Sequence, residues 1–471
     1  MCRDVRLSHA IADVLKRSGL HLVGMSATAQ PWPPPRTTPQ VTKPFPRIRS
    51  VKAYVQKTAG ATTANKQGSD CHDVPIEHWI NGVTPMPIAN PMSVHPKYAQ
   101  ARTSWGINAL GSCVVEVEAD NGVTGVGVTT AGEPGCYIVE NHLSRFVEGA
   151  DPRNVERIWD QMWRATTNYG RKGLPLQAIS AVDLALWDLL GKLRGEPVYA
   201  LLGGKTKDRC PVYCTTARPE IVKAQGFAGA KVPCPYGPAD GDAGLAKNVA
   251  YFAKCRKMVG PDFPLMLDCY MALTVPYSIR LANALQPYGI KWIEEFLPPD
   301  DYDGYAEVRR ALIGTGVLTT TGEHEYTRYG FRRLIADRAV DVLQPDITWL
   351  GGMTEARRIV AMAAAYDIPV IPHGSSIYSY HLQYAFCNCP LAEFINLSPN
   401  SDVISPYFGG LFTDEPLPKD GFIDLPDRPG FGVTLIRDNL HRPYARSLAA
   451  SMANAAATQK PDPPCEPRVR L

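Results

Sequence analysis

Residues 291–296 read KWIEEF and lie between Gly289 and the prolines at 298 and 299. The stretch is apolar apart from its first residue and its two acids, and turn-forming residues bound it, which is typical of a buried strand. Neighbouring residues of a strand point to opposite faces, so Glu294 and Glu295 are predicted to face opposite sides. If one side is the interior of a barrel, a carboxylate there needs a cationic partner, because burying it alone is costly.

Similar apolar runs recur through the second half of the chain and alternate with helical patterns. Examples are LMLD at 265–268 and VLTTTGE at 317–323, with the helical stretches SIRLANALQPYG at 278–289 and TEARRIVAMAAAYD at 354–367. Such alternation indicates parallel strands joined by helices. About seven or eight units over residues 176–420 predict a (β/α)₈ barrel, complete or one unit short. The alternative is an open doubly wound sheet, although no GxGxxG follows a first strand to support nucleotide binding.

The segments on either side of this repeat differ from it. Residues 46–175 read as an α+β domain, in which Asn121-Gly122 joins two alternating apolar runs and predicts a hairpin. The Gly- and Pro-rich segment 421–450 is expected to return to that domain. The leader, residues 1–45, and the tail, residues 451–471, have linker-like compositions and are expected to be disordered.

Composition narrows the class of protein. The 471 residues are 45% hydrophobic and carry a net charge of +3, without a basic stripe, so neither nucleic acid nor an anionic membrane surface is an expected partner. No apolar run reaches about 18 residues, which predicts no membrane span. The 12 cysteines show no zinc-finger spacing, and reduced thiols in the cytoplasm fit them best.

Ionisable residues mark the predicted strands at intervals of 20 to 29 residues, each about one strand–helix unit. In a parallel barrel the carboxyl ends of all strands open on one face, so residues distant in sequence converge there. The six residues are Asp268, Glu294, Glu323, Asp346, His373 and Glu393.

The first three of these residues offer oxygen ligands from neighbouring strands, the donor set that Mg²⁺ prefers. Glu294 would then face the metal, and Glu295 would point to the opposite side, toward a basic residue. The next two form a pair in which Asp346 accepts a hydrogen bond from one nitrogen of His373 and raises the basicity of the other. Each acid alone could be a solvent-exposed loop residue, His373 a core histidine and Asp346 a capping residue.

Several segments together resemble the mandelate racemase-like sugar-acid dehydratases of the enolase superfamily, over about residues 46–445. They are DCHDVPIEHWI, TTAGEPGC, AKVPCPYGPADGDAG, LMLDCYM, KWIEEFLPP, TGEH, LQPDITWLGG, IPHGSSIYSYH and DRPGFGV. The resemblance implies an α+β capping domain over a modified TIM barrel, (β/α)₇β. It also implies a small-molecule sugar-acid substrate, one Mg²⁺ per subunit and a homo-oligomer.

The resemblance further assigns roles to individual residues. It implies that Asp268, Glu294 and Glu323 bind the metal and that His373 is the base, with Asp346 as its partner. Glu393 is expected to hydrogen-bond the substrate carboxylate and to donate to the developing enolate if protonated. In the capping domain, His78 and Arg102 correspond to substrate-binding positions; without the family, they would read as a surface histidine and a solvated arginine.

One departure from the wider superfamily bears on the chemistry. Racemases there carry two lysines, K-x-K, at the end of the second barrel strand, whereas this chain reads Lys231-Val232-Pro233. Proline cannot act as a base, so racemisation is disfavoured and a one-base elimination is expected; the role of Lys231 stays open. The alternatives are a dehydratase for a different sugar acid, a metal-dependent sugar isomerase and a non-catalytic structural relative.

Overall fold

The computed structural model of the protein describes residues 44–56, 88–96, 110–398 and 401–460. The chain divides into Met1–Phe45 and Pro46–Leu471, and every helix and strand described below belongs to the second unit. Two main sheets organise it: a four-stranded antiparallel sheet and a curled parallel sheet.

The antiparallel sheet has the strand order β14-β1-β2-β3. Strands β2 and β3 pair from Cys113↔Thr129 to Glu118↔Thr124, so the hairpin predicted at Asn121-Gly122 is confirmed. Small helical elements complete this domain. The bounds are β1 Ile48–Gln56, η1 Pro91–Val94, β2 Cys113–Ala119, β3 Thr124–Thr129, α4 Gly132–Ile138, η4 Val139–Leu143, α5 Ser144–Val147 and α6 Val155–Thr166.

Helix α7, Leu174–Arg194, packs against this sheet with 16 of its 21 residues buried. Two glycines of β3 make the close approach: a Cβ on Gly125 or Gly127 would lie about 2 Å from a backbone oxygen of α7. The expected domain boundary at 175/176 therefore falls inside a helix that covers the antiparallel sheet. Helix α7 is also long and apolar enough to cross a membrane, but 89% of its apolar window is buried, which makes this weak evidence.

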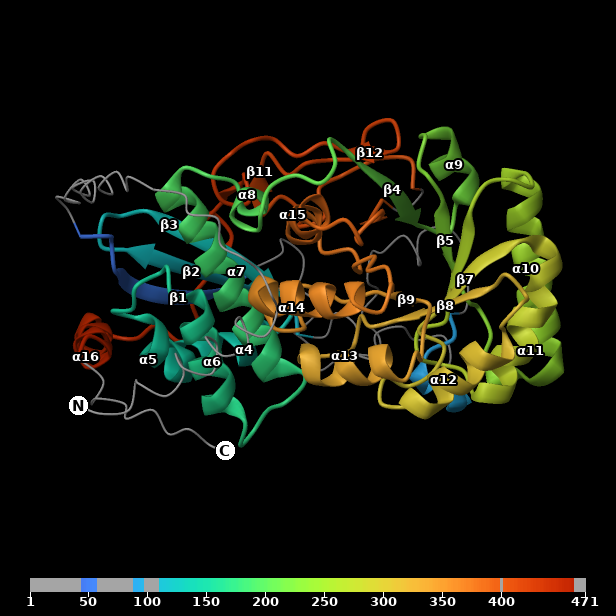
Figure 1. Ribbon diagram of the computed structural model, residues 1–471, viewed down its shortest axis with the longest axis horizontal. Helices are drawn as coiled ribbons and strands as arrows, with labels where there is room; N and C mark the ends of the chain where they lie inside the picture. Colours follow the sequence, from blue (N-terminus) through green and yellow to red (C-terminus); the bar gives the residue numbers. More distant parts are fainter. Residues whose placement is uncertain (1–43, 57–87, 97–109, 399–400, 461–471) are drawn as a thin grey trace, which may run out of the picture. The chain divides into compact units, whose positions relative to one another are not determined.

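The parallel sheet runs in the order β10-β4-β5-β6-β7-β8-β9, so β10, its last strand along the chain, pairs with β4, its first. An isolated parallel bridge, Leu343↔Val370, adds the strand-like segment before His373. In Figure 1 the helices α10 and α11 lie outside β5 to β8. The bounds are β4 Cys210–Thr215, β5 Ala230–Pro233, β6 Leu265–Asp268, β7 Ile290–Glu294, β8 Leu318–Thr321, β9 Val342–Leu343 and β10 Ala392–Ile395.

One helix follows each strand or strand-like segment except the last, which gives the predicted (β/α)₇β barrel with its α+β capping domain. These helices have amphipathic sequences, like the helical stretches identified from the sequence. The barrel helices are α9 Pro219–Ala224, α10 Gly241–Val259, α11 Val275–Leu285, α12 Tyr302–Ala311, α13 Thr327–Ala336, α14 Gly352–Ala364 and α15 Ile377–Ala385, with α8 Val198–Leu201 before the first strand and short η5 Pro238–Asp240 and η6 Gln286–Tyr288 between.

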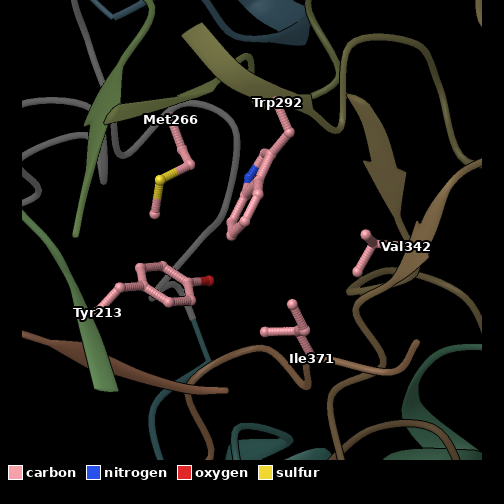
Figure 2. Close-up of a cluster of buried hydrophobic side chains, with 5 residues drawn as sticks. All are labelled: Tyr213, Met266, Trp292, Val342 and Ile371. Atoms are coloured by element: carbon pink, nitrogen blue, oxygen red, sulfur yellow. The ribbon is translucent and has the colours of Figure 1, made fainter. Parts of the chain in front are cut away.

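Apolar side chains fill one end of the barrel interior. Figure 2 shows them pointing toward one another from different strands, with the Tyr213 and Trp292 rings edge to face at 5.4 Å. This cluster closes the barrel below the strand ends that carry the polar residues. Its buried members are Tyr213, Met266, Trp292, Val342 and Ile371.

The C-terminal segment contacts both sheets. Strand β12, Phe422–Ile423, pairs with β4, and β14, Leu440–His441, pairs with β1. Arg442 and Arg446 then form ion pairs with the buried carboxylates of Glu140 and Glu148. Two further strands, β11 Phe412–Thr413 and β13 Thr434–Leu435, pair with each other.

The expectation of a disordered tail from residue 451 is wrong for residues 451–458. Helix α16 spans Leu448–Thr458, and its N-terminus is capped by the Ser447 side chain, which accepts a hydrogen bond from the Ala450 amide. The segment is rich in alanine, the residue with the highest helix propensity. Its weak amphipathic pattern explains why the sequence alone suggested a tail.

Candidate active site

Three carboxylates that the sequence predicts as metal ligands lie at the carboxyl ends of neighbouring strands. Asp268 ends β6 and Glu294 ends β7, and the two residues are direct partners in the parallel register. Glu323 follows the next strand, β8, after Gly322. All three side chains are buried, and Glu294 is fully so.

Lys231, at the second position of β5, is the lysine that contacts this group. Its Nζ lies 3.2 Å from Asp268 Oδ2 and 2.9 Å from Glu393 Oε1, and it also pairs with Glu294. Carboxylates from three strands thus converge on one ammonium group that is itself only 1% exposed. The sequence left the role of Lys231 open; here it neutralises part of the buried negative charge.

His373 and Asp346 form the predicted pair. His373 Nδ1 lies 2.8 Å from Asp346 Oδ2, which leaves Nε2 facing the acids, 3.5 Å from Glu323 Oε1. Asp346 is fixed by the amide of Thr348 and the hydroxyl of Ser375, both of which donate to its other oxygen. Burial opposes the charge on His373, but Glu323 and the bond to Asp346 outweigh it and raise the pKa of His373 to about 10.

Glu393, on β10, is surrounded by donors. The Gly374 amide donates to its Oε2 at 2.9 Å, the Thr215 hydroxyl donates to Oε1, and Lys231 contacts the same oxygen. Although burial opposes ionisation, the Lys231 ammonium lowers the pKa of Glu393. In this structure Glu393 is therefore an ionised hydrogen-bond acceptor. The sequence analysis expected it to donate a hydrogen bond only if it were protonated.

Glu295 does not point to the opposite side of the sheet, as the alternation of strand residues predicted. Strand β7 ends at Glu294, and Glu295 has a left-handed backbone with φ 43°. The chain therefore turns before alternation can place this side chain on the outer face. The prediction of a basic partner is confirmed, because Glu295 Oε2 lies 2.8 Å from Nδ1 of His324.

A second set of potential ligands follows from this turn. Ligand atoms of Glu295, Glu323 and His324 all lie within 4.8 Å of one another. Burial opposes the charge on His324, but Glu295 and Glu323 outweigh it and raise the pKa of His324 to about 9. A protonated imidazole has no lone pair to offer a metal. In this structure, His324 pairs with Glu295 beside Glu323.

The acids of the site outnumber its cations. Burial raises the pKa of Asp268 to about 6, that of Glu323 to about 7 and that of Glu294 to about 8, against the opposing effects of the site's basic groups. Within the described part of the chain, six buried carboxylates face one lysine and two histidines. A hard divalent cation suits such an oxygen-rich set, and Mg²⁺ fits it by ligand type. The six acids are Asp268, Glu294, Glu295, Glu323, Asp346 and Glu393.

The sequence analysis did not identify two residues of the site, and two residues that it did identify lie outside the described part of the chain. Gln344 Nε2 donates to Glu294 Oε2 at 2.9 Å, and the Trp349 ring lies against both His324 and His373. Trp349 falls in a loop, which has no periodicity to reveal its direction. Gln344 follows a strand run read from the sequence, and its interior position could have been found by counting two residues back from Asp346. His78 and Arg102 lie outside the described residues.

Comparison with known protein families places this geometry in context. Residues 90–203 match the family model of the mandelate racemase / muconate lactonizing enzyme N-terminal domain, and residues 216–439 match the enolase C-terminal domain-like model. The L-rhamnonate dehydratase of Saccharopolyspora erythraea is 54% identical over 399 residues, which cover 84% of this chain and 99% of that protein.

Solved structures agree with these matches. A rhamnonate dehydratase from Gibberella zeae complexed with Mg has 46% identity and a TM-score of 0.78, with 89% of this chain and 99% of that one covered. The 3,6-anhydro-D-galactonate cycloisomerase from Zobellia galactanivorans is more distant, with 29% identity, a TM-score of 0.62 and coverage of 70% and 94%. The chain therefore belongs to the mandelate racemase / muconate lactonizing enzyme family of the enolase superfamily.

Proposed function

We propose that the protein is a Mg²⁺-dependent dehydratase that converts L-rhamnonate to 2-dehydro-3-deoxy-L-rhamnonate and water. The observation that carries this proposal is the His373–Asp346 pair, which faces an acid-rich site with no lysine at position 233 to serve as a second base. The similarity to rhamnonate dehydratases over most of the chain supports the choice of substrate.

His373 is proposed as the base and then as the acid. The acids of the site raise the pKa of His373, and a divalent cation held by those acids would offset their charge and favour the neutral imidazole, the form that can act as a base. In that form Nδ1–H donates to Asp346 and the lone pair is on Nε2, the nitrogen on the side of Glu323. Nε2 takes the C2 proton, and the electrons of the C2–H bond form the C1–C2 double bond of an ene-diolate. The C3–O bond then breaks as the carbonyl re-forms at C1, and the imidazolium returns the proton to the departing hydroxyl. Water leaves, and the enol tautomerises to the 2-keto acid.

Asp268, Glu294 and Glu323 would hold the metal. When bound, Mg²⁺ supplies Lewis-acid stabilisation of negative charge on the substrate. Lys231 is paired with Asp268, Glu294 and Glu393 and is proposed to hold these carboxylates in place beneath the substrate. His78 and Arg102 are proposed to bind the remainder of the sugar acid. The homo-oligomer and the cytoplasmic location expected from the sequence are part of this proposal; light scattering tests the first.

The deciding experiment follows proton exchange at C2 in D₂O together with water loss. Wild-type enzyme with Mg²⁺ is expected to form the 2-keto acid from L-rhamnonate, and the His373→Asn variant is expected to lose both elimination and exchange. Exchange at the wild-type rate in the variant would refute the assignment of the base. A panel of six-carbon and 6-deoxy aldonic acids separates L-rhamnonate from other sugar acids, and full activity after exhaustive chelation would refute the metal requirement.

A further inference from the structure

Trp349 differs from the other buried tryptophans in the described part of the chain. Trp159 Nε1 donates to the Gly351 carbonyl at 2.7 Å, Trp187 Nε1 to the Thr354 hydroxyl at 2.8 Å, and Trp292 Nε1 to Glu294 at 3.2 Å. The indole N–H of Trp349 is buried and has no hydrogen-bond acceptor among the described residues, and the residue is only 9% exposed. Buried donors are nearly always satisfied, so this one needs an explanation.

The unsatisfied indole lies within the candidate active site. Its ring centroid is 5.1 Å from that of His324 and 5.9 Å from that of His373, the proposed base. Trp349 thus contacts the two imidazoles that border the acid cluster. If a substrate places its C2 proton at His373, the substrate atoms next to C2 lie close to the Trp349 ring.

The loop that carries Trp349 is held on both sides, which fixes the backbone from which the ring projects. The Thr129 hydroxyl, on β3 of the capping domain, donates to the Thr348 carbonyl at 2.8 Å. The Thr327 amide donates to the Leu350 carbonyl at 3.1 Å, and the Trp349 amide itself donates to the Asp346 carbonyl at 3.1 Å. Such preorganisation is expected of a side chain that recognises a ligand.

We infer that Trp349 determines substrate specificity by donating its indole N–H to a hydroxyl of the sugar-acid chain beyond C3. The inference rests on the proposed function for the position of C2. The acid's own carboxylate is the less suitable acceptor, because the residues proposed to hold Mg²⁺, which would attract it, end or follow β6, β7 and β8, whereas Trp349 follows β9. An indole N–H only donates, so a substrate that lacks the matching oxygen leaves it unpaired. The substrate class is therefore a polyhydroxylated aldonic acid, and short or distally deoxygenated acids are rejected.

The test compares Trp349→Phe with Trp187→Phe, a matched control that loses an indole N–H far along α7. Thermal unfolding without substrate comes first. Trp187→Phe is expected to lower the melting temperature because it leaves the Thr354 hydroxyl without its donor, whereas Trp349→Phe is expected not to lower it. A similar drop for both variants would overturn the inference, since it would reveal a structural acceptor for Trp349.

Kinetics with L-rhamnonate and its 4-deoxy and 5-deoxy derivatives then identify the hydroxyl. Trp349→Phe is expected to lower kcat/KM about 10-fold on L-rhamnonate and to match the wild type on one deoxy acid, since that acid offers nothing to the indole. Binding of the unreactive 3-deoxy acid, measured by calorimetry, should weaken by a similar factor. An equal loss on every acid, or no loss on any, would overturn the inference. A wild-type enzyme that ignores L-rhamnonate but dehydrates another aldonic acid would refute the proposed substrate instead, and the same comparison then uses the deoxy forms of that acid.

Discussion

The barrel interior has two layers that the same strands build with opposite chemistry. The lower layer is the apolar cluster of Figure 2, and the upper layer is the candidate active site. Residues two apart on a strand share a face, so each strand contributes to both layers. The pairs are Tyr213 and Thr215, Met266 and Asp268, Trp292 and Glu294, Val342 and Gln344, and Ile371 and His373.

This difference shows how a polar site is kept dry without a separate structural element. The lower layer excludes water from beneath the acids, and charges interact more strongly where the surroundings are less polar. Trp292 joins the layers, because its ring packs on Tyr213 below while its Nε1 donates to Glu294 above. A shift of one residue in any strand would exchange interior and exterior side chains.

Removing a charge from the upper layer should affect catalysis most. Glu294→Gln is expected to lower kcat at least about 1,000-fold at saturating Mg²⁺, equivalent to about 4 kcal/mol in the barrier, because an anionic oxygen of the proposed metal site is lost. The unfolding free energy in EDTA should not fall, since an acid is removed from an acid-rich cluster. Turnover within 10-fold of wild type would show that Glu294 is not a metal ligand.

Emptying the lower layer should have the reverse effect. Trp292→Ala is expected to reduce the free energy of unfolding by about 3–4 kcal/mol, since it removes a large buried ring and leaves a cavity. Urea denaturation in EDTA measures this change. Trp292→Phe, which keeps an aromatic ring but loses the bond to Glu294, should cost about 1 kcal/mol. If the alanine variant is as stable as the wild type, the cluster is not the floor of the site.

Two buried histidines in different surroundings are expected to respond differently to pH. His373 is surrounded by acids, whereas His381 on α15 lies between the rings of Tyr199 and Phe431, and burial lowers the pKa of His381 to about 3. The unfolded chain takes up a proton near pH 6.5 that the folded chain excludes, so stability falls as pH decreases below 6.5 toward 3. On lowering the pH from 8 to 5, this residue should reduce the free energy of unfolding by about 2 kcal/mol. Urea denaturation of wild type and His381→Gln across this range tests the effect, and identical pH profiles would contradict it.

The sequence predicted those parts of the molecule that depend on regular elements. Strand periodicity and spacing were enough to place Asp268 and Glu294 on adjacent strands, because both side chains end apolar runs. The rule failed at Glu295, where a left-handed residue ends the alternation. Sequence alone does not reveal that backbone angle.

Loop side chains and ionisation states were harder to predict. Trp349 and His324 lie after strands, in segments whose conformation depends on contacts with distant parts of the chain, such as the bond from the Thr129 hydroxyl to the Thr348 carbonyl. The ionised state of Glu393 depends on Lys231, which comes from another strand and whose direction was not predicted. These features arise from convergence in space, which one-dimensional patterns do not encode.

The late pairing of β12 with β4 and of β14 with β1 has a consequence for synthesis on the ribosome. A nascent chain can form most of both sheets, yet the first strand of each gains its final neighbour only after residues 422 and 441 have emerged. Until then the carboxylates of Glu140 and Glu148 also lack Arg442 and Arg446. A chain that stops before Phe422 therefore lacks both β12 and β14, and quality-control proteases would meet β4 and β1 without these neighbours.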